Sequence, residues 1–290
     1  MEITEILKKK KQVITSELGP PKGTDLTEFF KQAAFLKGRA DGINVTDQQA
    51  AIMRLGSLAC CIRLKEHGFE PIMQITVRDK NRIALQSELL SAGVFGIENV
   101  LVLSGDPIQI GDHPDAKPVF DLDAVQLMSA IRTLEAGTDL GGKKLAGAPR
   151  FCIAAAANPC VKDLDTEFSK LRNKIQNGAE FFQTQGIFDP ALYHAFHARL
   201  KKEGITHPVL GGIILLKSAK MAKFMNEKIP GIVIPQDLID ALEKAPDPRA
   251  ECVRIAVETM KAIKGETAGF HVMAMGWEDL VPEILAKAGF

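Results

Sequence analysis

Short apolar runs recur along the chain, and each is followed by a segment whose apolar residues return every three or four positions. The runs predict eight β-strands, at residues 13–17, 43–46, 71–76, 100–104, 151–157, 180–185, 208–215 and 269–273. The segments after them predict eight α-helices, at residues 25–37, 48–67, 81–92, 122–134, 164–177, 190–203, 218–227 and 278–288. Two further helices are predicted at 235–243 and 249–264, ahead of the last strand.

Eight consecutive β–α units are what a (β/α)8 barrel needs, and about 250 residues is a typical length for one. Several of the strands are continuous apolar runs, as expected of parallel strands buried on both faces. An open, doubly wound sheet has the same alternation, but no GxGxxG motif follows the first strand. The pattern therefore favours an α/β fold with a single (β/α)8 TIM barrel over residues 1–290. The extra helices before the last strand are expected to pack outside the barrel.

Composition narrows the class of protein. Lys and Arg number 36, as do Asp and Glu, so the formal net charge is zero, and 46% of the 290 residues are hydrophobic. This balance argues against a disordered chain and against a nucleic-acid or anionic-membrane binder. The five cysteines form no CxxC pair and no Cys/His cluster, which predicts reduced thiols and no metal site.

The sequence also predicts neither a membrane helix nor a signal peptide. The apolar runs are far shorter than the roughly 20 residues of a membrane helix. Residues 1–5 are acidic, and no apolar segment typical of a signal peptide follows them. We therefore expect a cytoplasmic protein that binds no membrane.

Polar residues stand where the predicted strands end, and in a (β/α)8 barrel these ends carry the chemistry. The strand-end positions are Glu17, Thr46, Thr76, Asp106, Asn158, Gln185 and the region 273–276. Two carboxylates from different strands could face one cavity, with Glu17 as a general acid and Asp106 as a polarising charge. These residues alone leave the type of reaction open.

The segments around these positions resemble the methylenetetrahydrofolate reductase family. The matching motifs occur in the family's order, at residues 14–21 (ITSELGPP), 44–46 (NVT), 103–106 (LSGD), 171–179 (LRNKIQNGA), 183–189 (QTQGIFD) and 269–271 (GFH). Each motif is short, but together they extend over nearly the whole chain, from about residue 13 to residue 275.

The resemblance implies a flavin-dependent reductase that converts methylenetetrahydrofolate to methyltetrahydrofolate. Glu17 matches the family's general acid, which helps to open the five-membered ring to an iminium ion before hydride arrives from reduced flavin. Asp106 matches an aspartate that lies near flavin and pterin, with a role in catalysis and in binding the cofactor and the substrate. Gln185 matches the glutamine that binds the pterin. The positions implied for the cofactor are Thr46, Thr76, Ser104, Gly105, Asp106, Asn158 and Lys174.

The chain also departs from the family's pattern. Ser104 and Asn173 stand where Arg is common, Gln74 where His is common and Ala156 where Tyr is common, and the strand-seven motif is changed at residues 212–215. FAD is the cofactor that the resemblance implies, with FMN as the alternative because these changes remove stacking and phosphate contacts. The electron donor is either NAD(P)H or a reduced iron–sulfur partner protein. Tetrahydrofolate is the expected substrate, and the chain is expected to form a homo-oligomer.

Two other functions are compatible with such a barrel. A folate-handling methyltransferase would bind methyltetrahydrofolate at acidic and amide residues of the barrel mouth, without flavin. A barrel kept as a non-catalytic subunit of an electron-transfer complex is disfavoured, because Glu17, Asp106 and Gln185 are all present.

Overall fold

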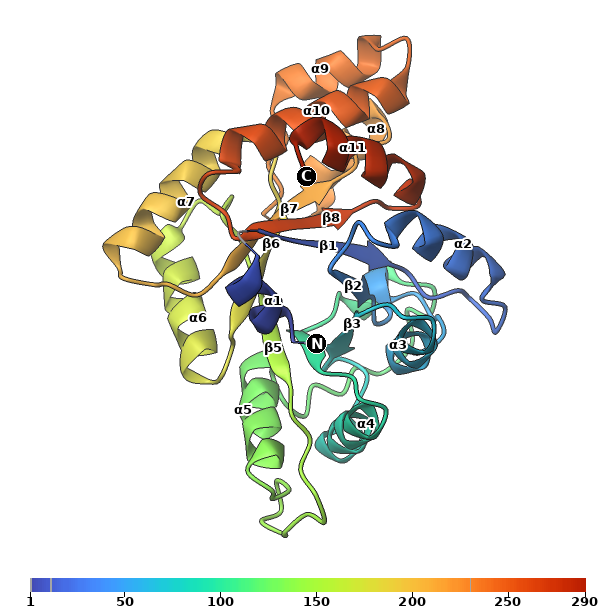
Figure 1. Cartoon of the computed structure of the whole chain (residues 1–290), viewed down its shortest axis with the longest axis vertical. Coiled ribbons are helices and arrows are strands. Elements are labelled where there is room, and N and C mark those ends of the chain that lie inside the picture. Colours follow the sequence, from blue (N-terminus) through green and yellow to red (C-terminus); the bar gives the residue numbers. More distant parts are fainter. Residues whose placement is uncertain (1, 11, 230) are drawn as a thin grey trace.

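The computed structural model describes residues 2–10, 12–229 and 231–290, and in it eight parallel strands close into a barrel (Figure 1). The strands are β1 (Val13–Leu18), β2 (Gly42–Val45), β3 (Pro71–Thr76), β4 (Asn99–Leu103), β5 (Cys152–Ala157), β6 (Phe181–Gly186), β7 (Val209–Ile214) and β8 (Gly269–Met273). Each strand pairs with the next one along the chain, and β8 pairs with β1. The closed ring confirms the predicted barrel and rules out the open sheet.

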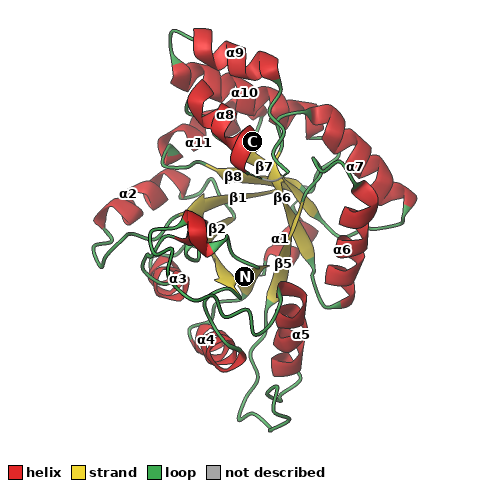
Figure 2. Ribbon diagram, turned by 180° about the vertical axis from the view of Figure 1, so that it is seen from behind, coloured by secondary structure: helices red, strands yellow, loops and turns green. Residues whose placement is uncertain are grey.

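Helices surround the ring of strands, as Figure 2 shows. They are α2 (Thr27–Leu36), α3 (Ser57–Glu66), α4 (Arg82–Val94), α5 (Ala124–Glu135), α6 (Leu164–Gln176), α7 (Pro190–Lys202), α8 (Ala219–Lys228), α9 (Gln236–Lys244), α10 (Pro248–Ile263) and α11 (Val281–Ala288). The extra helices α9 and α10 lie between β7 and β8 and pack outside the barrel, as predicted. Among the described residues, no helix is both long and apolar enough to cross a membrane.

The predicted helix over residues 48–67 is wrong in its first half. Residues Gln49–Ala51 form one short 3-10 turn, and the helix itself begins only at Ser57. Gln48, Ala50 and Ala51 have positive φ values of 49°, 55° and 55°, which cost roughly 1 kcal/mol or more each in a residue with a Cβ. Contacts with distant loops hold this segment, since the Met53 N–H donates to Asp112 Oδ1 over 3.0 Å. We call residues 48–56 the β2 loop. The predicted helix over 278–288 likewise begins with a 3-10 turn, Glu278–Leu280.

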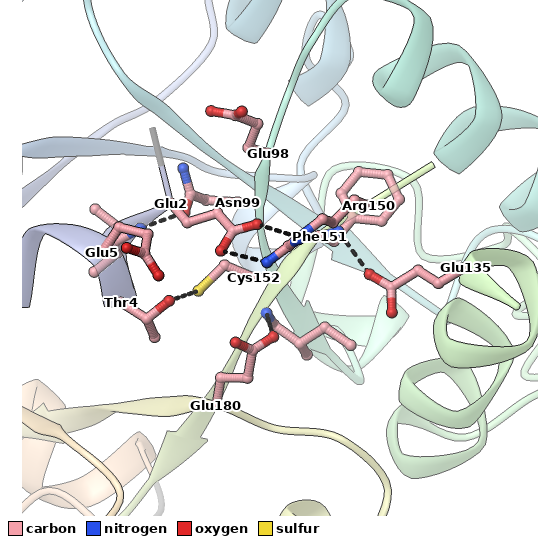
Figure 3. Close-up of polar contacts among 12 residues, drawn as sticks. Glu2, Thr4, Glu5, Glu98, Asn99, Glu135, Arg150, Phe151, Cys152 and Glu180 are labelled. Atoms are coloured by element: carbon pink, nitrogen blue, oxygen red, sulfur yellow. Dashed lines mark hydrogen bonds and ion pairs between the residues drawn. The ribbon is translucent and has the colours of Figure 1, made fainter. Parts of the chain in front are cut away.

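A helix that the pattern did not predict, α1 (Ile3–Lys9), covers the N-terminal end of the barrel. Its Ile3 is fully buried in one apolar cluster with inward residues of several strands, among them Ile72, Leu101 and Leu210. The Ile3 N–H donates to Asn99 Oδ1 at 2.8 Å. Figure 3 shows the next residue, Thr4, in contact with Cys152 of β5. This end of the barrel is therefore packed shut.

A charged hollow of about 380 Å³ lies beside this closed end. Arg132 pairs with Glu135 at 2.6 Å and with Glu180 at 2.7 Å. Arg150 pairs with Glu2 at 2.7 Å, as Figure 3 shows. Because each arginine of the hollow is already paired with carboxylates, we assign a structural role to these contacts. They join α5 to the start of β6 and the N-terminal residues to the segment before β5.

Candidate active site

A cavity of about 440 Å³ opens at the carboxyl ends of the strands. The sequence-predicted residues that line it are Glu17, Thr76, Ser104, Gly105, Asp106, Asn158, Lys174 and Gln185. They come from six segments of the chain between β1 and β6, and the barrel brings them together because parallel strands all end at one face. Thr46 does not line the cavity; it is buried at the end of β2.

Glu17 lies on the inner wall of the barrel, and its side chain is 11% exposed. The Gln74 side chain donates from Nε2 to Glu17 Oε2 at 3.0 Å, and Gln49 donates from Nε2 to Oε1 at 3.3 Å. His271 Nε2 lies 3.8 Å from Oε2. The carboxyl group is thus held by side chains that can exchange hydrogen bonds with it in either protonation state, because amides both donate and accept.

A layer of polar side chains lies below Glu17, deeper in the barrel. Gln183 exchanges two hydrogen bonds with Asn44, of 2.8 and 3.0 Å, and donates to Thr15 Oγ1 at 3.1 Å. Thr15 Oγ1 in turn lies 2.9 Å from His271 Nδ1. These side chains are all buried, so the network satisfies groups that would otherwise be costly in the interior. It gives the cavity a fixed polar floor.

Asp106 lies in the loop after β4, on the exposed rim of the cavity. Its Oδ2 accepts the backbone N–H of Ala50 at 2.7 Å, so the β2 loop is attached to the carboxylate. Gln49 from the same loop reaches Glu17. Both predicted catalytic carboxylates therefore contact the β2 loop, whose Gln49 lines the cavity.

A buried carboxylate, Asp47, joins the ends of β2 and β3. Its Oδ2 accepts from the Thr76 N–H at 2.9 Å, from Thr76 Oγ1 at 3.0 Å and from Lys80 Nζ at 3.1 Å. Burial by itself lowers the pKa of Lys80, but Asp47 and Glu88 outweigh it and raise that pKa, so the lysine stays charged. The cluster fixes Thr76 at the cavity wall.

The opposite wall carries positive charge. Lys170 and Lys174, one turn apart on α6, both line the cavity, and Lys174 Nζ donates to the Ala156 carbonyl at 2.7 Å. Burial lowers the pKa of Lys174. Asn158 is fixed beside them, because its N–H donates to Glu167 Oε1 at 2.8 Å. This wall is suited to an anionic group such as a phosphate.

Thr46 Oγ1 is the one buried side-chain nitrogen or oxygen, within the described part of the chain, that has no hydrogen-bond partner. A buried hydroxyl without a partner costs free energy, so such atoms often mark a place for a missing group. Among the same described residues, no group of three His, Cys, Asp or Glu side chains is placed to hold a metal ion.

Sequence reasoning did not assign Gln49, Gln183 or His271 to the site. Gln183 and His271 stand two positions before Gln185 and Met273 on the same strands, and residues two apart point to the same face. That period of two could have found them. Gln49 could not be found in this way, because it was placed in a helix. Of the departures noted above, Gln74, Ser104 and Ala156 line the cavity, whereas Leu215 is buried in the core outside it.

Comparison with known proteins gives one consistent answer. The family profile described as "Methylenetetrahydrofolate reductase" matches residues 2–289. Methylenetetrahydrofolate reductase 2 of Schizosaccharomyces pombe is 26% identical over 247 residues, which are 78% of this chain and 36% of the yeast protein. The chain thus spans about a third of the length of this relative. The 5,10-methylenetetrahydrofolate reductase of Pectobacterium carotovorum is 24% identical over 281 residues, 92% of this chain and 87% of that protein.

A solved structure from Clostridium thermocellum has the same fold, with a TM-score of 0.64, 16% identity and coverage of 99% of this chain and 98% of that one. It is described as an uncharacterised protein that binds two copies of 5-methyl-5,6,7,8-tetrahydrofolic acid.

Proposed function

This chain belongs to the methylenetetrahydrofolate reductase family, and from that premise we propose that it reduces methylenetetrahydrofolate to methyltetrahydrofolate with a bound flavin. The observation that carries the proposal is one cavity that holds Glu17, Asp106 and Gln185 together with a lysine-bearing wall. The folate-bound structure from Clostridium thermocellum, with the same fold, supports a folate as the ligand. Nothing in the site favours the flavin-free methyltransferase.

Glu17 is proposed as the general acid. It would donate its proton to the folate nitrogen that leaves the methylene carbon, so that the five-membered ring opens to an iminium ion. Gln74 can donate to the carboxylate after the proton has left and can accept from the acid before, by turning its amide. The polar floor below would hold Glu17 in place through both states.

Asp106 and Gln185 are proposed to hold the pterin ring. Gln185 Oε1 accepts the Gly186 N–H at 3.0 Å, and its NH2 group has no partner within the described residues. That donor is available to a ring carbonyl or nitrogen. The Ala50 N–H uses only part of the accepting capacity of the Asp106 carboxylate, so Asp106 can also accept hydrogen bonds from N–H groups of the pterin ring.

Flavin fits the remaining features of the cavity. Lys174 and Lys170 would pair with its phosphate. The Thr46 hydroxyl has no hydrogen-bond partner among the described residues, but it is buried outside the cavity lining, so the flavin contact proposed for it rests on the family resemblance. Thr76, Ser104, Gly105 and Asn158 would line its binding surface. A bound flavin would supply the hydride that the methylene carbon accepts. FAD is proposed on the family resemblance, with FMN as the alternative.

Lys174→Met is expected to weaken flavin binding at least about tenfold, because a charge-assisted hydrogen bond contributes roughly 1.5–3 kcal/mol. Wild-type affinity should fall as the pH rises, since Lys174 loses its proton at a lower pH than an ordinary lysine. Fluorescence titration of the flavin-free protein with FAD and with FMN measures both effects.

The matched control is Lys220→Met, because Lys220 is exposed on α8 and does not line the cavity. It should bind flavin like the wild type at each pH. Equal affinities for Lys174→Met and Lys220→Met would remove Lys174 from the cofactor site.

The electron donor is proposed to be a reduced iron–sulfur partner protein rather than free NADH. The cavity wall has Ala156 and Ser104, both exposed, where bulkier or more polar groups are common in the family. We expect slow reduction of bound flavin by micromolar NADH and faster reduction by an artificial electron carrier. Stopped-flow absorbance of the purified chain measures both rates, and rapid bleaching by micromolar NADH would contradict the partner hypothesis.

The whole chain, residues 1–290, is proposed to act as one catalytic barrel, in a homo-oligomer. The function is tested by reducing the flavin-loaded chain without oxygen and adding methylenetetrahydrofolate. We expect stoichiometric methyltetrahydrofolate, detected by mass spectrometry. Reduced enzyme that leaves the substrate unchanged would overturn the proposed function.

A further inference from the structure

Arg78, just after β3, is buried to 1% exposure, although arginine is rarely buried unless it is paired. Asp79 supplies the counter-charge, with Nε to Oδ1 at 2.8 Å and Nη2 to Oδ2 at 2.6 Å. This fork-to-fork pair satisfies two of the five donors of the guanidinium group. The other donors are available for different partners.

Those other donors reach the two neighbouring loops. Nη1 donates to the Asp106 carbonyl at 2.9 Å, and Nη2 donates to the Gln48 carbonyl at 3.2 Å. The Arg78 carbonyl accepts the Val119 N–H at 2.7 Å, from the segment that leads to α5. One side chain thus joins the loops that follow β2, β3 and β4.

Gly105 shows how closely these loops fit. Its φ is +90°, and a Cβ placed there would lie 2.9 Å from Arg78 Cβ and 3.4 Å from Thr76 Cβ. The backbone leading into Asp106 therefore rests directly on Arg78, and only glycine allows both the conformation and the approach.

The β2 loop depends on the same contacts. Gln48 and Ala50 have positive φ values, and such conformations persist only where their surroundings fix them. Arg78 holds the Gln48 carbonyl, and Asp106 holds the Ala50 N–H. Two of the fixed points of the loop are thus Arg78 itself and the aspartate whose backbone Arg78 holds.

We propose that Arg78 is a positioning residue of the active site, which sets the place of the Asp106 carboxylate and of the β2 loop at the folate pocket. Arg78 does not line that cavity, so it acts through Asp106 and not on the ligand. The role in folate binding rests on the proposed function of Asp106.

Arg78→Lys is the first test. Lysine keeps the charge next to Asp79, but its single nitrogen cannot reach Asp106 and Gln48 together. We expect the dissociation constant of methyltetrahydrofolate to rise about tenfold in this variant. The rise should be less than twofold when Asp106→Asn is already present, because Arg78 acts on folate through the Asp106 carboxylate, which asparagine lacks. The proposal would be overturned if Arg78→Lys raised the dissociation constant by the same factor with and without Asp106→Asn. It would also be overturned if Arg78→Lys alone left the dissociation constant unchanged.

Arg82→Lys is the matched control. Arg82 forms a similar two-pronged pair with Asp121, at 2.8 and 2.9 Å, but on the exposed surface beside α4. The affinity of the Arg82→Lys variant for methyltetrahydrofolate should stay within twofold of the wild-type value. If Arg78→Lys does not fold, Gly105→Ala tests the same contact, since its Cβ would push the Asp106 backbone away from Arg78.

Amide hydrogen exchange separates this proposal from the proposed function. Without the Arg78 fork, the Ala50 N–H should lose its bond to Asp106, and the peptide covering residues 48–53 should exchange at least tenfold faster than in wild type or Arg82→Lys. This result needs no folate chemistry, so it would stand even if the chain did not reduce folate. Unchanged exchange in Arg78→Lys would overturn the positioning role.

Discussion

Glu17→Gln is expected to slow the reduction of methylenetetrahydrofolate by at least about 100-fold, the usual scale of a general acid's contribution. Glutamine has nearly the same shape, and it can keep hydrogen bonds to Gln74 and Gln49, but it has no acidic proton to give. The flavin should remain bound, and an artificial donor should still reduce it at the wild-type rate. Single-turnover mixing of reduced enzyme with folate measures the loss.

The control for this experiment is Glu66→Gln, an exposed glutamate that pairs with Arg63 on α3, away from the cavity. Its turnover should equal that of the wild type. Glu17→Gln with unchanged turnover would make Glu17 a structural residue, and the acid would have to be sought among the other groups of the cavity.

Gly212→Ala is expected to lower the free energy of unfolding by about 3 kcal/mol. The Cβ would lie 2.3 Å from the Thr184 carbonyl oxygen and 2.8 Å from that of Gln185, and both are backbone atoms that cannot turn away. The register of β6 against β7 shifts at this point, between Gln183 and Gly186. The alanine would force β6 and β7 apart at a point where their backbones are in close contact. Urea denaturation followed by circular dichroism measures the change.

The neighbouring Gly211→Ala provides the matched control. Its Cβ would meet first the Cδ1 atom of Ile263, at 3.0 Å, which is the end of a flexible side chain. We expect a loss below about 1 kcal/mol. Equal losses for the two variants would show that the bulge in β6 does not have the tight backbone contact described here.

Gly212→Ala should also weaken folate binding in the fraction that folds. The Gly212 N–H donates to Thr184 Oγ1 at 2.8 Å, which fixes the bulge that carries Gln185 into the cavity. Gly211→Ala leaves this contact intact, so its folate affinity should be that of the wild type. Together the two variants test whether the packing of β6 against β7 sets the position of Gln185, the residue proposed to bind the pterin.

Much of the fold is determined locally by the sequence. The bounds of all eight strands were predicted to within one residue, because each strand is a short run of apolar residues that must be buried on both sides. Barrel closure then places all carboxyl ends at one face. For this reason the strand-end positions Glu17, Asp106 and Gln185 could be expected in one cavity before any coordinates were known.

The errors occur where distant contacts outweigh local preference. Residues 48–56 have helical spacing, yet the Ala50 and Met53 amides bond to Asp106 and Asp112, more than fifty positions away. The short helix α1 forms because Ile3 fits the open end of the barrel. Neither interaction has a signal in the segment itself, so no local pattern could reveal them.

The candidate active site also combines features that the sequence predicts with features that only the tertiary structure determines. Residue type and strand position were enough to select the two carboxylates and the glutamine, since only polar side chains at those ends stand out from apolar strands. The orientation of Glu17 by Gln74 and Gln49, and of Asp106 by Arg78, was decided by the tertiary structure alone. Hydrogen bonds between loops depend on three-dimensional proximity across the barrel mouth, which a linear pattern does not contain.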